Sequence, residues 1–564
     1  MATVLASSSP AEGWEEKVKA KRKQQQESIP QEWVISQIKT TPNVLDIPAT
    51  CGLMTARELE ITGTDDVSVV LENLSRGAWS SFEVTTAFCK RAVIAHQLTN
   101  CLTEIFVKEA LERATELDDH LKRTGKVVGP LHGLPISLKD QYRIKGLEAT
   151  MGYVSWIGQL AKDDAATVKL LIQNGAVLYV KTNVPQTLMW GETLNNVFGR
   201  TLNPHNTAFT SGGSTGGEGA LIALHGSVLG VGTDVAGSIR IPSHYNGIYG
   251  FKPSSQRVPT YGMVNALEGQ DVVPTVAGPL SASISGLKAF MHTILSSRPW
   301  TVDPNVIRKP WDSDAYALKE HGDGQGLCFG VIWDDGHLKP HPPINRALQM
   351  AKLALEKAGH TVIDWVPLHH RELNANARSI FLSDGAEDYR SAITPSGEPM
   401  ITSMRPGADP ADVPVFRQPR KPLSAFELWQ LHKERRELRH AYFEHWNTTA
   451  SVTGTGRPVD ALIAPVMPYT SVPHGSTGPA TYTLVFSTLD CPSLVFPVTK
   501  VDPVADSRAP PHEFRGADDE ALYNLYNPGV MSGMPVGLQL VAQRNEEEAL
   551  LAMGAIMDSA LKKL

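Results

Sequence analysis

The chain has 564 residues, of which 42% are hydrophobic and 20% are charged, and its formal net charge at pH 7 is -7. This composition is ordinary for a globular protein with a large core. The mildly acidic balance gives no electrostatic footprint for nucleic acid, so we expect no nucleic-acid partner. The five cysteines follow no pairing pattern, which favours a reducing compartment over a disulfide framework.

Targeting signals are weak throughout the sequence. Residues 1–10 lack the basic flank and apolar run of a secretory signal, and no apolar stretch approaches the ~20 residues that a membrane helix needs. We interpret the basic run Lys19–Lys23 as the solvated face of a leading helix rather than as a nuclear address. We therefore expect a cytoplasmic protein with no membrane segment.

The first predicted elements are helices followed by strands. Residues 1–60 are predicted to form a polar helix and an extended arm, and residues 61–564 a single domain. Apolar side chains recur at helical spacing over Phe106–Gly125, where the glycine occupies the position of a C-terminal cap. Segment Asp164–Thr182 predicts a helix, a turn at Gly175 and a strand over Ala176–Val180. Such helix–glycine–strand units are typical of an α/β layered fold.

The second half of the chain contains a long irregular segment. Seven prolines occur in 395–422, which predicts an excursion that is either a lid over a pocket or an elaboration without function. It ends at Ser424, which with Glu427 predicts a capping box for a helix running to about Trp446. The last helix is predicted to begin at Asn545, with acidic residues in its first turn that complement the helix dipole.

Three segments carry residues suited to catalysis. Lys139 ends the short apolar run Gly133–Lys139, Ser214 lies within the glycine-rich Ser211–Gly219, and Ser238 lies within Gly230–Pro242. A hydroxyl nucleophile needs a base, and a lysine can be that base only where burial lowers its pKa. A second hydroxyl can carry protons between the two, and the amides of a glycine-rich turn can stabilise an oxyanion. This set therefore suits amide hydrolysis.

Each segment also has an ordinary interpretation. A lysine after a strand is usually a surface residue, and a Gly-Gly-Ser-Thr-Gly-Gly run alone could be a flexible turn. Gly230, Gly232 and Gly237 have the spacing of a weak dinucleotide-binding motif. That interpretation fails because Pro242 follows too closely for the expected helix to begin and continue.

Together, the three segments resemble the signature of the amidase signature family. That family has a lysine in Gly-x-Pro-x-x-x-Lys-Asp, a serine in Gly-Gly-Ser-Ser-Gly-Gly and a nucleophile in Asp-x-Gly-Gly-Ser-Ile-Arg-x-Pro. These positions fall on Lys139, Ser214 and Ser238, and the serine spacing of 238 − 214 = 24 is usual for the family. The resemblance spans roughly residues 60–560, and it includes the flanking segments Lys181–Gln186, Gly250–Ser254 and Gly533–Val541.

The resemblance implies an α/β amidase signature fold, in which a large twisted mixed β-sheet is surrounded by α-helices. It implies an acyl-enzyme on Ser238, a proton relay through Ser214 after a cis peptide bond, and Lys139 as the base. The amides of Val235, Ala236, Gly237 and Ser238 would form the oxyanion hole. No metal and no organic cofactor are implied, and a homodimer is left open.

The substrate is less constrained than the reaction. Phrases such as Pro130–Pro135 and Ser155-Trp156 resemble fungal acetamidases, which implies a small aliphatic or aryl amide. Leu188, followed by Met189 and Trp190, is expected to line the substrate site. The chain departs from the family pattern at Thr215 and at Ala236, whose methyl group is expected to face the acyl group.

Three alternatives remain open at this point. Gly212–Gly216 also fits the nucleophile elbow of an α/β-hydrolase, which would make Ser214 the nucleophile of a serine esterase, although Asn203–Thr207 before it is predicted to be a loop instead of a strand. The second is an inactive amidase-fold binding protein, supported only by Ala236. The third is the glutamine-hydrolysing subunit of a transamidation complex.

Overall fold

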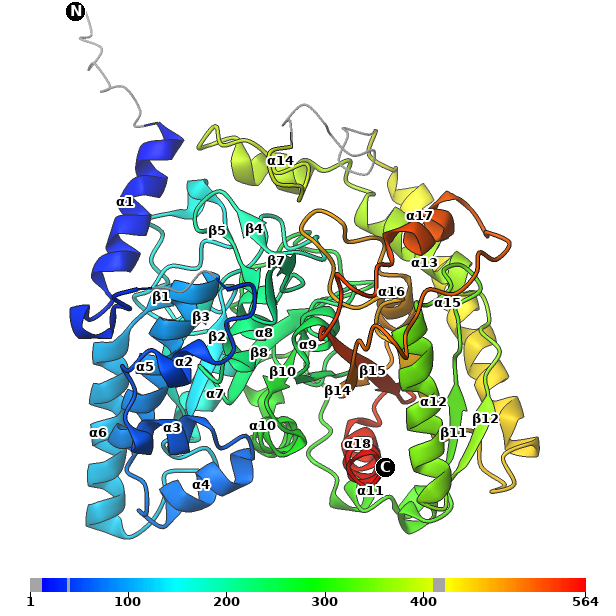
Figure 1. The fold of residues 1–564 in the computed structure, drawn as a ribbon, viewed down its shortest axis with the longest axis horizontal. Coiled ribbons are helices and arrows are strands. Elements are labelled where there is room, and N and C mark those ends of the chain that lie inside the picture. The colour runs from blue at the N-terminus through cyan, green and yellow to red at the C-terminus, as the bar shows by residue number, and fades with distance from the viewer. Residues whose placement is uncertain (1–12, 38–40, 409–420) are drawn as a thin grey trace, which may run out of the picture.

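The computed structural model describes residues 13–37, 41–408 and 421–564. The predicted absence of a signal in residues 1–10 and three prolines of the irregular segment (Pro410, Pro414 and Pro419) lie outside these ranges. Within them, eleven strands form one sheet in the order β1-β3-β2-β8-β10-β9-β14-β15-β13-β11-β12 (Figure 1). Its strands are β1 Leu102–Ile105, β2 Pro135–Lys139, β3 Val177–Thr182, β8 Leu229–Asp234, β9 Tyr249–Lys252, β10 Val276–Ser281, β11 Cys328–Val331, β12 Thr361–Asp364, β13 Ala461–Pro465, β14 Ser493–Lys500 and β15 Pro535–Val541.

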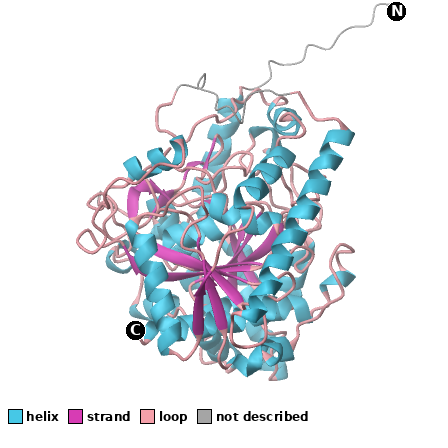
Figure 2. Cartoon of the chain, turned by 90° about the vertical axis from the view of Figure 1, so that its right-hand side faces the viewer, coloured by secondary structure: helices cyan, strands magenta, loops and turns pink. Residues whose placement is uncertain are grey.

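The sheet is mixed, as predicted. Strands β3, β2 and β8 pair in parallel, the neighbours from β8 to β13 are antiparallel, and β13, β11 and β12 are again parallel. Two small hairpins lie outside it: β4 Leu194–Asn195 with β5 Gly199–Arg200, and β6 Leu202–Asn203 with β7 Asn206–Thr210. In Figure 2 the strands fan out around a common centre, which displays the twist of the sheet.

Helices cover the sheet. The first nine are α1 Trp14–Glu27, α2 Ile47–Thr50, α3 Ala56–Thr62, α4 Val67–Ser75, α5 Ser81–Thr99, α6 Val107–Thr124, α7 Ala166–Gln173, α8 Gly216–Ala223 and α9 Arg240–Asn246. They are followed by α10 Ile284–Ser296, α11 Ser313–Tyr316, α12 Pro342–Lys357, α13 His370–Phe381, α14 Glu387–Ile393, α15 Ala425–Thr448, α16 Thr481–Thr488, α17 Ala517–Leu525 and α18 Glu547–Lys562. Helices lie on both sides of the fan of strands in Figure 2.

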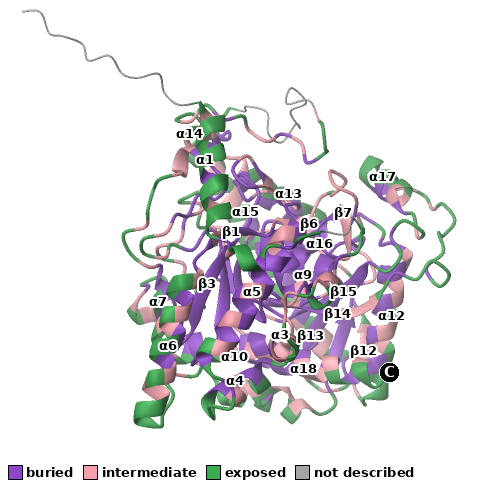
Figure 3. Cartoon of the chain, turned by 60° about the vertical axis from the view of Figure 1, so that its left-hand side comes forward, coloured by how far each residue is buried: buried purple, intermediate pink, exposed green. Residues whose placement is uncertain are grey.

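Burial explains the composition of the central strands. Every residue of β2, β3, β8 and β15 is buried, and Figure 3 shows the sheet as buried, whereas exposed residues gather on outer helices such as α6. Parallel strands covered by helices on both faces are expected to be continuously apolar. A polar residue at the end of such a strand, such as Lys139, is therefore buried with it.

The local predictions agree well with these elements. Helix α6 matches the predicted 106–125 segment, and Gly125 caps it in the left-handed conformation. The capping box is confirmed, because Ser424 Oγ accepts from the Glu427 amide and the Glu427 carboxylate accepts from the Ser424 amide. Helix α18 begins at Glu547, two residues later than predicted.

One basic residue was interpreted incorrectly. Lys21 is 3% exposed, because its ammonium group pairs with Glu104 at 2.6 Å and Glu148 at 3.1 Å. The basic run is therefore a solvated face only in part. The acidic first turn predicted for the last helix is confirmed in α18. Glu547 and Glu548 are also buried there, and they accept from Arg257 at 2.8 and 2.7 Å. In α1 and in α18, the partners of the buried charges come from distant parts of the chain. A local charge pattern does not predict such partners.

The described part of the irregular segment is anchored through a carboxylate. Glu398 accepts hydrogen bonds from the Val154 amide, Gln186 Nε2 and Asn196 Nδ2 at 2.6–2.9 Å. Residues 395–408 contain turns but no helix and no strand, as predicted. None of the helices in the described ranges combines the length and apolarity that crossing a bilayer requires.

Candidate active site

The sheet brings two of the three catalytic candidates to one edge. Lys139 is the last residue of β2, and Ser238 lies in the turn between β8 and α9. Leu138 pairs in parallel with Val231, and the carboxyl ends of neighbouring parallel strands meet at the same edge of a sheet. Ser214 reaches this edge from the turn between β7 and α8.

Lys139 is fully buried and hydrogen-bonded to two hydroxyls. Its ammonium nitrogen lies 2.8 Å from Ser214 Oγ and 2.7 Å from Thr233 Oγ1. Burial lowers the pKa of Lys139 to about 7, although Asp234 and Glu218 act in the opposite direction. Burial also raises the pKa of Glu218 to about 8, so this neighbour is mostly neutral at pH 7 and attracts the ammonium form only weakly.

Thr233 and Gln141 hold the lysine in place. Thr233 Oγ1 donates to Gln141 Oε1 at 2.6 Å, and Gln141 Nε2 donates to the Val264 carbonyl at 2.9 Å. With its hydrogen donated to Gln141, the Thr233 oxygen accepts from Lys139. Sequence reasoning missed both residues, although Gln141 directly follows the Lys-Asp pair and Thr233 precedes Asp234 in the third segment.

Ser214 lies in a geometry unlike that of a nucleophile elbow. The Gly213–Ser214 peptide bond is cis, as expected from the resemblance. The segment before it forms the hairpin of β6 and β7, which differs from the predicted loop, but this hairpin is separate from the main sheet. The partner of the Ser214 hydroxyl is Lys139, whereas an elbow serine pairs with a histidine.

The turn that carries Ser238 is organised by Asp234. Its carboxylate accepts from the amides of Gly237 and Ile239 at 2.8 and 3.1 Å, and from the guanidinium of Arg240 at 2.9 and 3.0 Å. Burial by itself would raise the pKa of Asp234, but the charge and hydrogen bonds of Arg240 outweigh it and lower the pKa to about 2. The ion pair is therefore a fixed part of the turn.

One amide of the predicted oxyanion hole, that of Gly237, already has a hydrogen-bond partner in this structure. The Gly237 amide is occupied by Asp234, because a side-chain carboxylate readily accepts from a backbone amide a few residues further along a turn. Glycine is nevertheless required there: its φ is +132°, and a Cβ atom would lie 2.5 Å from Thr483 Oγ1. The amides of Val235, Ala236 and Ser238 remain the candidate donors.

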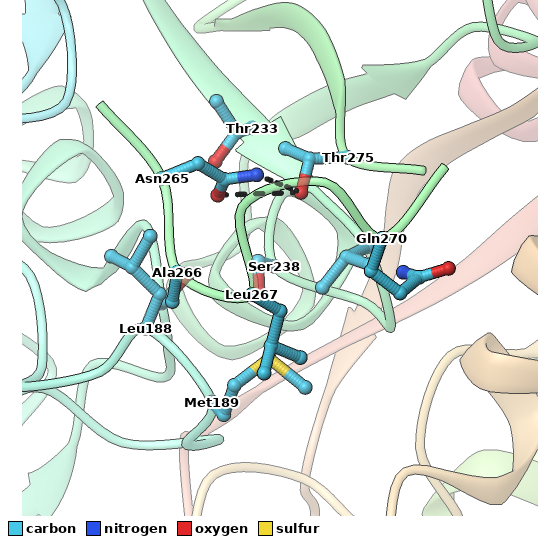
Figure 4. Close-up of a pocket in the computed structure, with 11 residues that line it drawn as sticks. Leu188, Met189, Thr233, Ser238, Asn265, Ala266, Leu267, Gln270 and Thr275 are labelled. Atoms are coloured by element: carbon cyan, nitrogen blue, oxygen red, sulfur yellow. Dashed lines mark hydrogen bonds between the residues drawn. The ribbon is translucent and has the colours of Figure 1, made fainter. Parts of the chain in front are cut away.

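A small cavity joins the serines to an apolar wall (Figure 4). Its volume is about 20 Å³. The lining residues are Leu188, Met189, Ser214, Thr233, Val235, Ser238, Asn265, Ala266, Leu267, Gln270 and Thr275. Leu188 and Met189 thus lie where the sequence predicted them, and Trp190 does not line the cavity.

The loop over residues 265–275 forms the opposite wall, and no sequence motif indicated it. Asn265 and Thr275 are hydrogen-bonded to each other at 3.0 Å, which joins the two ends of this loop. Ala236 is absent from the lining. Its side chain instead packs in an apolar cluster with Val273, Phe381 and Leu484. The predicted contact of its methyl group with the acyl group stays a prediction.

Ser238 faces the cavity with a hydroxyl that forms no hydrogen bond to any residue in the described ranges. The step from Ser214 to Ser238 thus remains a prediction, although both residues line one cavity. Across the same ranges, no group of three or more His, Cys, Asp or Glu side chains is placed to hold a metal ion.

Comparisons with known proteins agree with this geometry. A family model described as Amidase matches residues 83–551. The chain is 39% identical to the acetamidase of Aspergillus oryzae, over 98% of this chain and 99% of that protein. It is 40% identical to the acetamidase of Emericella nidulans, over 96% and 97% of the two chains.

A solved structure extends the similarity to three dimensions. A fatty acid amide hydrolase superposes with a TM-score of 0.89 at 31% identity, covering 98% of this chain and 95% of that chain. Sequence and fold therefore agree over nearly the whole length. The chain belongs to the amidase family, that of the amidase signature enzymes, and is an amide hydrolase.

Proposed function

We propose that this enzyme hydrolyses a small carboxamide to a carboxylic acid and ammonia or an amine, through an acyl-enzyme on Ser238. Lys139 is the base and Ser214 relays protons between the two. The observation that carries the proposal is the hydrogen bond from a fully buried Lys139, with its lowered pKa, to Ser214 beside the cavity that Ser238 lines.

The proposed reaction has two stages, formation of the acyl-enzyme and its hydrolysis. Ser238 Oγ attacks the amide carbon while its proton passes to Ser214, whose own proton passes to neutral Lys139. The amides of Val235, Ala236 and Ser238 stabilise the oxyanion. The proton then returns along the same path to the leaving nitrogen as the C–N bond breaks. Water attacks the acyl-enzyme in the same way and restores Ser238.

The size of the cavity supports a small acyl group. The space beside the two serines, of about 20 Å³, suits a short acyl group. A larger cavity of about 1030 Å³ shares Asn265, Leu267 and Gln270 with it. The apolar side chains of Leu188, Met189 and Leu267 suit a short aliphatic group. Similarity to acetamidases points the same way.

The test is to find which serine carries the acyl group. A fluorophosphonate should modify the peptide containing Ser238, as seen by mass spectrometry after digestion. Ser238→Ala should abolish labelling. Ser214→Ala should slow labelling without moving it, because the nucleophile remains while its proton relay is broken.

A stable adduct on Ser214 of the wild-type protein would contradict the assignment and favour the elbow mechanism. A panel of acetamide, propionamide, benzamide and a fatty amide, followed by ammonia release, tests the substrate class. Acetamide and propionamide should give the highest kcat/KM. No turnover of any amide by protein that still binds the probe would favour the inactive-scaffold alternative.

A further inference from the structure

A second cavity lies beside α15, and none of its lining residues belongs to the proposed catalytic set. Its volume is about 350 Å³, within the range of about 300–1,000 Å³ typical of small-molecule sites. Its walls come from residues 255–260, 271–276 and 303–306, from α15, and from Asp490 and Arg544 after α16 and β15.

Arg435 of α15 is the unusual residue in this cavity. It is only 8% exposed, and its Nε atom is buried with no hydrogen-bond partner. The whole guanidinium forms no ion pair or hydrogen bond with any residue of the described ranges. A buried charge is costly unless it is paired, so an unpartnered guanidinium that lines a cavity indicates a missing anion.

The neighbouring carboxylates are bonded to other groups, and none of those in the described ranges is hydrogen-bonded to Arg435. Asp490 already accepts from the Ser255 amide and hydroxyl at 2.8 and 2.7 Å, and from Arg544 Nε at 2.6 Å. Asp303 accepts from three backbone amides at 2.9–3.0 Å. The remaining carboxylate of the lining, that of Asp271, forms no ion pair or hydrogen bond with Arg435 in the described part of the chain.

A second guanidinium reinforces the positive charge. Arg439 lies one helical turn from Arg435, lines the same cavity, and forms no ion pair within the described part of the chain. Burial, followed by the charge of Arg439, lowers the pKa of Arg435 to about 10, although the charge of Asp490 acts in the opposite direction. The two cations therefore repel each other, and a shared anion would remove that repulsion.

We propose that this cavity binds a small oxyanion, a phosphate or a carboxylate, between Arg435 and Arg439. The planar guanidinium presents paired N–H donors that match the oxygens of either group. Both sources share this chemistry: phosphate is supplied from solution, and a carboxylate is the product of amide hydrolysis itself.

The proposed anion site adjoins the catalytic cavity. Thr275 lines both this cavity and the catalytic cavity, so the two cavities share one residue. Binding of the anion nevertheless depends on neither Ser238 nor Lys139, and it can be tested apart from catalysis.

The experiment is calorimetric titration of the whole protein with sodium phosphate, and separately with sodium acetate, at constant ionic strength. One anion should bind per chain, and Arg435→Met should weaken binding at least tenfold. Lys433→Met removes an exposed cation from the same helix and should bind like wild type, as should Ser238→Ala. Arg439→Met provides a second test if the first variant folds poorly.

The preferred probe identifies the source: tighter binding of phosphate or of acetate supports the proposal in either case. Binding of neither anion, or equal binding by wild type and both arginine variants, would overturn it. An equal loss in Lys433→Met would also overturn it, because binding would then reflect net charge. Acetate binding that survives Arg435→Met and Arg439→Met belongs to the catalytic cavity and counts against the site.

Discussion

Lys139 illustrates how one residue acquires its chemistry from its surroundings. An exposed lysine is protonated at pH 7 and cannot accept a proton, but burial at the end of β2 lowers the pKa of Lys139 to about 7. Thr233 and Ser214 then orient its nitrogen through hydrogen bonds of 2.7 and 2.8 Å. Lys139 can therefore accept a proton near neutral pH.

Replacement of Lys139 by Met should lower kcat/KM at pH 7 by about 10²–10⁴-fold, because the base is lost. In the wild-type enzyme, the neutral lysine is populated above its folded pKa, so kcat/KM should rise with pH and level off above about 7. The measurement is a pH–rate profile of both proteins. Identical profiles would exclude Lys139 as the base.

Ala236 and Gly237 make a matched pair for testing the turn. Gly237→Ala should destabilise the protein by about 2 kcal/mol or more, because φ is +132° and the added Cβ meets Thr483. Ala236→Gly should cost only about 1 kcal/mol, since only a methyl group of an apolar cluster is lost.

Thermal unfolding of the two variants provides the stability comparison. The ratio of kcat/KM for acetamide and benzamide should stay within about twofold in Ala236→Gly, because the side chain does not line the cavity. A large change in that ratio would place the methyl group against the acyl group after all.

At the scale of elements, the link between β8 and α9 depends on one buried ion pair. Asp234 ends β8 and Arg240 begins α9, and both side chains are fully buried. Arg240 also donates to the Thr483 carbonyl and to Ser487 Oγ, which ties the turn to α16. The proposed nucleophile is thus held by contacts from two helices and a strand.

Asp234→Asn should therefore destabilise the protein by about 3–5 kcal/mol at pH 7, because Arg240 is left buried and uncompensated. The folded-state pKa of Asp234 is lowered from 3.8 to about 2. Its contribution to stability is thus fully present above about pH 4 and is lost as the pH falls toward 2. Denaturant unfolding of wild type and variant across this range would reveal the difference. A variant as stable as wild type at pH 7 would contradict it.

At the scale of the whole molecule, the N-terminal helix is tied to the sheet through Lys21. Its pairing with Glu104 and Glu148 connects α1 to β1 and to the segment that follows β2. The division at residue 60 into an arm and a domain stays a prediction, as does a homodimer.

Lys21→Met should loosen α1, because two partly buried carboxylates lose their cation. Amide hydrogen exchange in 14–27 should become at least about tenfold faster, equivalent to about 1.4 kcal/mol of local stability. Lys19→Met, which removes an exposed charge from the same helix, should leave exchange unchanged. Equal exchange rates in both variants would show that the buried pair does not hold the helix.

Much of the fold and of the site follows from local sequence. Helix periodicity and caps involve residues within a few positions of one another, which is why α6 and the capping box of α15 were predicted well. The strand that ends at Lys139 and the positions of both serines also follow from short motifs, so the sequence alone determined the family and the candidate catalytic set.

Tertiary structure decided how those residues are used. Lys139 meets Thr233 across 94 residues through the pairing of β2 with β8, and it meets Ser214 across 75 residues. Capture of the Gly237 amide by Asp234, the orientation of Ala236 and the burial of Lys21 depend on which surfaces pack together. A one-dimensional pattern specifies which face of an element is apolar, but not which side chain of a distant element lies opposite it.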